Sequence, residues 1–113
     1  MNSRRRVNST VIRPQMDDQV RNYREMLETA MRRLEPHSTA GRIVGSDMSQ
    51  FLVVDRHDRG VELYADEKHC LVLDPFVGEN LQGEITYPSF ELALDAAVRW
   101  LDGCDLHDLR PAV

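Results

Sequence analysis

The strongest pattern in the chain is a helical stripe between residues 16 and 34. Its apolar residues recur at spacings of three and four, the period of one face of an α-helix. Pro36 follows directly, and a proline inside a helix removes a backbone hydrogen bond, so we expect the helix to end before it. Residues 1–14 show no such period, and we predict a mobile basic arm there. The stripe consists of Met16, Val20, Tyr23, Leu27, Ala30, Met31 and Leu34.

Short runs of β-type residues follow the helix, separated by polar or glycine-bearing turns. The run 61–65 alternates apolar and polar residues, which is typical of a half-buried strand. The connections are short, so neighbouring strands are predicted to pair antiparallel, as a meander of about four strands. The strand-like runs are 42–45, 50–55, 61–65, 69–74 and 84–87.

A second amphipathic helix closes the chain. Ser89 is suited to cap its first turn, and Gly103 is suited to end it. The elements together predict an α+β fold, a two-layer sandwich in which an N-terminal and a C-terminal helix cover one face of the sheet. We assign residues 15–104 to this single domain and residues 105–113 to an acidic, irregular tail.

Two of the predicted strands, 50–55 and 69–74, are apolar on both faces. Because two helices on one side leave the other face of the sheet bare, that face needs a further cover. A second subunit is the simplest cover, and we therefore expect a homodimer.

Composition narrows the class of protein. At 113 residues the chain has the size of one domain, and 42% hydrophobic with 29% charged residues is ordinary for a folded globule. No apolar run approaches the roughly 20 residues that cross a bilayer, and two cysteines are too few for a disulfide framework. Lys68 is the one lysine among 14 basic residues, which suggests a GC-rich bacterial genome. We expect a cytoplasmic bacterial protein without membrane association.

The charge is uneven along the chain. Residues 1–42 carry nine arginines against five acidic residues, a net charge of +4, whereas residues 43–113 carry a net charge of −9. Such asymmetry indicates an interface between unlike surfaces, within a homodimer or with a partner. A solvated face in each half explains it equally well.

The best candidate for a metal site is a set of histidines and cysteines. His69, Cys70, Cys104 and His107 are the ligand types of a tetrahedral zinc site. Neighbouring residues in a strand point to opposite faces, however, so His69 and Cys70 cannot easily converge on one ion. We expect no metal.

Other chemistry is no better supported. Asp55, Asp66 and Lys68 match the residue types of a metal-dependent nuclease, yet two of them fall in a turn, where surface charges are usual. The chain has no nucleophile elbow and no glycine-rich phosphate loop. We therefore expect no catalytic residues, no cofactor and no enzyme activity. Direct nucleic-acid binding is not expected, because the arginines of residues 4–6 give only weak, salt-sensitive affinity for phosphates.

The helix of residues 16–34 is the best candidate for a partner-binding surface. Its stripe is wide enough to pack on its own sheet, and the sequence leaves open which face is core and which is interface. Methionine suits adaptable binding surfaces, and tyrosine and arginine are frequent at interface hot spots. The candidate partner-binding residues are Val20, Arg21, Tyr23, Arg24, Met26, Leu27, Ala30, Met31 and Leu34.

A chain of this length with a long N-terminal helix, a short antiparallel sheet and a closing helix resembles the QslA-like quorum-sensing anti-activators. Size, layout and the helix of residues 16–34 carry the resemblance. It implies a dimeric, non-enzymatic inhibitor that sequesters a LuxR-type transcription regulator by blocking its dimerisation and so its DNA binding. The run 87–101 also looks like the closing helix of immunity proteins, which neutralise a cognate bacterial toxin, and this function is the alternative.

Overall fold

The computed structural model describes residues 2–66 and 68–110, and their side chains from Asp17 onward. Two α-helices, six strands and three 3-10 turns follow one another along these residues. None of the described helices is both long enough and apolar enough to cross a membrane. The elements are α1 (Asn2–Leu34), η1 (Glu35–His37), β1 (Ala40–Val44), η2 (Asp47–Ser49), β2 (Phe51–Arg56), β3 (Arg59–Ala65), β4 (Leu71–Val77), β5 (Asn80–Leu81), β6 (Ile85–Tyr87), α2 (Phe90–Leu101) and η3 (Leu106–Leu109).

The strands form one antiparallel sheet in the order β1-β2-β3-β4-β5, and β6 also pairs with β4. β5 and β6 share the outer edge of β4: Leu81 pairs with Phe76, and Ile85 pairs with Leu73. Short turns join β2 to β3 and β3 to β4, as the sequence predicts for a meander. The α+β fold with an N-terminal helix, an antiparallel sheet and a C-terminal helix is confirmed.

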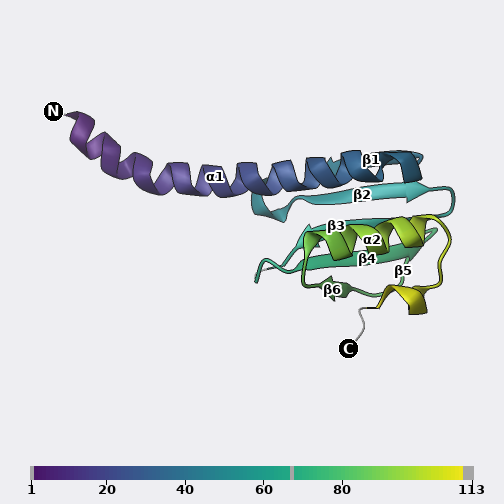
Figure 1. Ribbon diagram of the computed structural model, residues 1–113. Coiled ribbons are helices and arrows are strands. Elements are labelled where there is room, and N and C mark those ends of the chain that lie inside the picture. Colours follow the sequence, from purple (N-terminus) through teal and green to yellow (C-terminus); the bar gives the residue numbers. More distant parts are fainter. Residues whose placement is uncertain (1, 67, 111–113) are drawn as a thin grey trace.

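Both helices lie on one face of the sheet (Figure 1). Leu27 and Leu34 of α1 are fully buried there, and Leu94 and Trp100 of α2 are almost fully buried. Every second strand residue, such as Leu63 in β3, faces these side chains. The strand residues between them face the opposite side, where none of the described helices lies.

Local signals fix both ends of α2, as predicted. The Ser89 hydroxyl accepts the backbone N–H of Leu92 at 3.2 Å, which satisfies a free donor of the first turn. Gly103 follows the last turn with a φ of +111°, a conformation that side chains rarely adopt. The guanidinium of Arg59 lies 4.0 Å from the centroid of the Trp100 ring and donates to the Trp100 carbonyl, which ties the end of α2 to β3.

α1 is longer than the sequence predicts. Residues 2–14, which we expected to form a mobile arm, are helical, and residue 1 lies outside the described residues. Only the C-terminal half of α1 lies against the sheet (Figure 1), so only that half needs an apolar stripe. Residues 2–14 have no apolar stripe because no sheet lies beside them, and they form a helix without such a stripe.

Other boundaries also differ from the prediction. β4 continues to Val77, three residues past the predicted end at residue 74. β4 begins at Leu71, because His69 turns the chain with a φ of +64°. The tail, expected to be irregular, contains the 3-10 turn η3, and Leu109 is fully buried in the core. The Tyr87 hydroxyl donates to the Leu109 carbonyl and holds the tail in place, while residues 111–113 lie outside the described residues. The two-residue β5 has no counterpart in the sequence prediction.

The burial of Leu27 predicts a large loss of stability when its side chain is truncated. Leu27→Ala is expected to lower the free energy of unfolding by about 3 kcal/mol, because it leaves a cavity in the core. Leu92→Ala is the matched control: Leu92 is 49% exposed on α2, so we expect a change of about 0.5 kcal/mol or less. Urea unfolding measures both, and equal losses would contradict the assigned core.

Candidate protein-binding surfaces

The residues that the sequence nominates for partner binding divide between core and surface. Met26 and Met31 are partly buried and pack against the core. Four others are buried between α1 and the sheet, so they are not accessible to a partner in this fold. A charged substitution at one of them tests folding, not binding. These four are Tyr23, Leu27, Ala30 and Leu34.

The remaining three nominated residues form a surface with the turn η2. Val20, Arg21 and Arg24 line a hollow of about 420 Å³ between α1 and the segment that contains η2. Met48 in η2 is 45% exposed, although it is a large apolar residue. Met48 does not line this hollow; it lines a separate one with Phe51 and Tyr64. We call Val20, Arg21 and Arg24, with Ser46 and Asp47, the helix–loop surface.

Gln50, which is almost fully buried, holds η2 against α1. Its side-chain oxygen accepts Arg24 Nη1 at 2.7 Å, and its side-chain amide donates to the Asp47 carbonyl at 2.8 Å. The Tyr23 hydroxyl donates to the Gln50 carbonyl and accepts the backbone N–H of Ala65. Burial raises the pKa of Tyr23, which keeps this hydroxyl protonated as a donor. These bonds fix the position of Arg24 and η2 relative to the sheet.

The sequence prediction does not include η2 in this surface. Residues 46–49 have the composition of a polar connection between strands. Ser46 and Asp47, which line the hollow, carry no signal of a binding surface, because polar residues are usual in such a connection. The position of η2 against α1 depends on the buried side chain of Gln50. Glutamine is usually exposed, so the sequence does not predict this burial.

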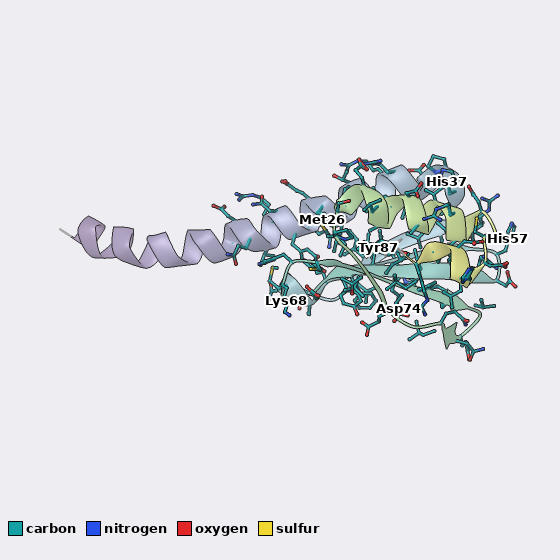
Figure 2. The ribbon with its side chains drawn as sticks, turned by 60° about the horizontal axis from the view of Figure 1, so that its bottom comes forward. Met26, His37, His57, Lys68, Asp74 and Tyr87 are labelled. Atoms are coloured by element: carbon teal, nitrogen blue, oxygen red, sulfur yellow. The ribbon has the colours of Figure 1, made fainter. Side chains whose placement is uncertain are left out.

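The second candidate surface is the face of the sheet that lies away from the helices. Its central row runs across four strands: Arg42 pairs with Val53, Val53 with Glu62, and Glu62 with Asp74. Figure 2 shows Asp74 on the opposite side of the sheet from α2. A hollow of about 540 Å³ lies over this row. We call this row and the apolar residues beside it the outer sheet face; the apolar residues are Val44, Phe51, Val72, Phe76 and Leu81.

Two carboxyl groups stand opposite each other on the outer sheet face. Glu62 and Asp74 are partners in register on neighbouring strands, which brings such side chains to about 5 Å of each other. Asp74 is 9% exposed, and its Oδ1 is buried without a hydrogen-bond partner among the described residues. Burial raises the pKa of both carboxyls, and the charge of Asp74 raises that of Glu62 further. Arg42 lowers the pKa of Glu62, and the Gly83 N–H lowers that of Asp74.

Asp66, one of the residues considered for metal chemistry, has a structural role. Within residues 2–66 and 68–110, no group of three or more His, Cys, Asp or Glu is arranged to hold a metal ion. Asp66 Oδ1 accepts the backbone N–H groups of Lys68 and Cys70, each at 2.9 Å. Asp66 therefore shapes the turn between β3 and β4.

The carboxyl pair predicts that neutralising Asp74 stabilises a single copy of the chain. Folding raises the pKa of Asp74, so this carboxyl binds protons more tightly in the folded state than in the unfolded state. The free energy of unfolding therefore falls as the pH rises above the pKa of an aspartate in the unfolded chain. Asp74→Asn removes this loss, and its amide can donate to Glu62. We expect a gain of about 1 kcal/mol at pH 7 that disappears below about pH 4.

Urea unfolding of dilute protein across this pH range measures the effect. Asp58→Asn is the matched control, because Asp58 is exposed in the turn between β2 and β3 and its replacement should change stability by about 0.5 kcal/mol or less. A destabilised Asp74→Asn variant at neutral pH would contradict the unfavourable pairing of the two carboxyls.

Comparison with known proteins finds no relative of this chain. No protein-family model matches the chain, no curated protein matches it, and no solved structure matches it. What the chain binds is therefore inferred from its own side chains.

Proposed function

We propose that the chain is a non-enzymatic inhibitor that binds a LuxR-type transcription regulator and blocks the regulator's dimerisation. The observation that carries the proposal is the helix–loop surface, where Val20, Arg21 and Arg24 line a hollow of about 420 Å³ beside η2. Arginine next to apolar side chains is typical of the residues that contribute most to protein interfaces.

Blocking dimerisation is sufficient to inhibit such a regulator. A dimeric regulator engages two DNA half-sites together, and a monomer loses the affinity gained from engaging both. A competing protein therefore needs a helix-sized surface and no reactive group. The solvent side of α1 and the adjoining η2 supply a surface of this kind.

The arginines of the helix–loop surface can exchange their present ion pairs for ion pairs with a partner at a small cost in free energy. Arg21 pairs with Asp18 one turn earlier, and its side chain is 61% exposed. Arg24 pairs with Glu28 at 3.4 Å and is 45% exposed. Exposed ion pairs of this kind stabilise a protein by about 1 kcal/mol or less, so a carboxylate of the partner can replace Asp18 or Glu28.

A second candidate function is an immunity protein that neutralises a bacterial toxin. Residues 43–113 carry a net charge of −9, and both Glu79 and Glu84 are exposed. Such a surface suits the basic active site of a nuclease toxin. Asp102 is exposed as well, and its carboxylate accepts Arg56 Nη1 at 2.7 Å.

Titration of a purified LuxR-type regulator, with its signal ligand bound, tests the first proposal. We expect the wild-type chain to bind the regulator and to release it from operator DNA in a mobility-shift assay. Arg21→Glu is expected to weaken binding at least tenfold, because it reverses a charge in the centre of the helix–loop surface. Isothermal titration calorimetry measures the affinity.

Arg32→Glu is the matched control for this experiment. It reverses the same charge at an exposed position on the same helix, about three turns from Arg21, and binding should equal that of the wild type. The proposal fails if no LuxR-type regulator binds, or if both variants weaken binding equally. Binding of a nuclease toxin that is lost in the Glu79→Lys variant would support the immunity function instead.

A further inference from the structure

The outer sheet face contains an acidic pair that a single copy of the chain compensates only in part: Arg42 lowers the pKa of Glu62, but the charge of Asp74 raises it. Asp74 Oδ1 is buried and has no hydrogen-bond partner among the described residues, and Glu62 stands directly opposite. Arg42 lies in the same row but two strands from Glu62, about 10 Å across the sheet. Two neighbouring carboxylates repel each other, so a further positive charge over this end of the row stabilises them.

We propose that a second copy of the chain covers this face, so that Arg42 of each copy meets the Glu62–Asp74 pair of the other. The central row is basic at one end and acidic at the other: Arg42 on β1, then Val53, then the two acids on β3 and β4. A twofold axis that lies between the two sheets, parallel to the strands, reverses the row of the second copy. Both basic ends then lie over acidic ends, which makes the face complementary to itself.

Arg42 is free to make this contact. Its side chain is 62% exposed, and its pairing with Asp55 is long, at 3.4 Å. A guanidinium presents several donors in one plane and can bind two carboxylate groups at once. Arg42 of a second copy therefore supplies a further positive charge to the acidic pair, which it can reach through the half-buried carboxyl of Glu62.

The apolar residues around the row suit a second sheet. Val44 is 36% exposed and Leu81 is 56% exposed, so each offers apolar surface that a partner can bury. The Phe76 ring lies against Gly60, where a Cβ atom would come within 2.3 Å of the ring Cζ. Glycine thus leaves room for the ring close to the sheet, and two sheets that pack face to face lie about 10 Å apart.

Sedimentation equilibrium over a wide range of concentrations tests the proposal. The wild-type chain is expected to approach twice its mass of 13.0 kDa as concentration rises. In the Arg42→Glu variant, the new carboxylate of one copy faces the Glu62–Asp74 pair of the other copy. In the Glu62→Arg variant, the new arginine pairs with Asp74 of its own copy and repels Arg42 of the other copy. Each variant alone is expected to raise the dimer dissociation constant at least tenfold.

A mixture of the two variants provides the decisive measurement. In a mixed dimer, the carboxylate introduced by Arg42→Glu in one copy meets the guanidinium introduced by Glu62→Arg in the other. The native Arg42 of the second copy meets the native acids of the first. The mixture is therefore expected to form heterodimers, detected by native mass spectrometry with one copy isotopically labelled. A misfolded variant could not be restored in this way.

Arg32→Glu on α1 is the matched control and is expected to dimerise like the wild type. A wild-type chain that stays monomeric at every concentration overturns the proposal and leaves the outer sheet face to a basic partner protein. A dimer that neither single variant weakens, or a variant mixture that forms no heterodimer, also overturns it, because the dimer would then use another surface.

Discussion

A sheet that is apolar on both faces needs two covers, and the two helices of this chain lie on the same side. Part of this constraint is met within the sheet: Val53 and Val72 are buried by their neighbours on the outer sheet face, outside the core cluster. The rest is left as the exposed side chains of Val44 and Leu81, and as the Oδ1 of Asp74, which has no hydrogen-bond partner among the described residues. The same one-sided packing turns the far side of α1 to solvent. Both candidate surfaces therefore follow from how the helices are distributed.

The core also determines which part of α1 can bind a partner. Burial of Leu27 and Tyr23 rotates Arg21 and Arg24 to the solvent side of the helix. Tyr23 and Arg24 both bond to Gln50, so the core side and the solvent side of α1 meet at one buried residue. A binding surface fixed to the core through hydrogen bonds loses little conformational freedom when a partner arrives, which favours affinity.

The predictable parts of the structure are those specified by local signals. Ser89 and Gly103 mark the ends of α2 by their own chemistry, whatever they pack against. β5 could not be predicted, because a two-residue strand such as Asn80–Leu81 exists only through its pairing with β4. The stripe of α1 was evident, but whether it was core or interface depended on the position of the sheet. In the sequence, Asp74 looks like a polar residue at the end of a strand. Its burial depends on neighbours from other strands, which the sequence does not show.

The two candidate surfaces can be occupied at the same time. The hollow of the helix–loop surface and the hollow over the outer sheet face share no lining residue. A pair of copies joined through their outer sheet faces would therefore present two helix–loop surfaces, related by the twofold axis. Each helix–loop surface could then hold one regulator monomer, so one pair of copies could keep two monomers from dimerising. Arg42, Glu62 and Asp74 would then affect the inhibition without touching the regulator, because they determine whether the inhibitor is bivalent.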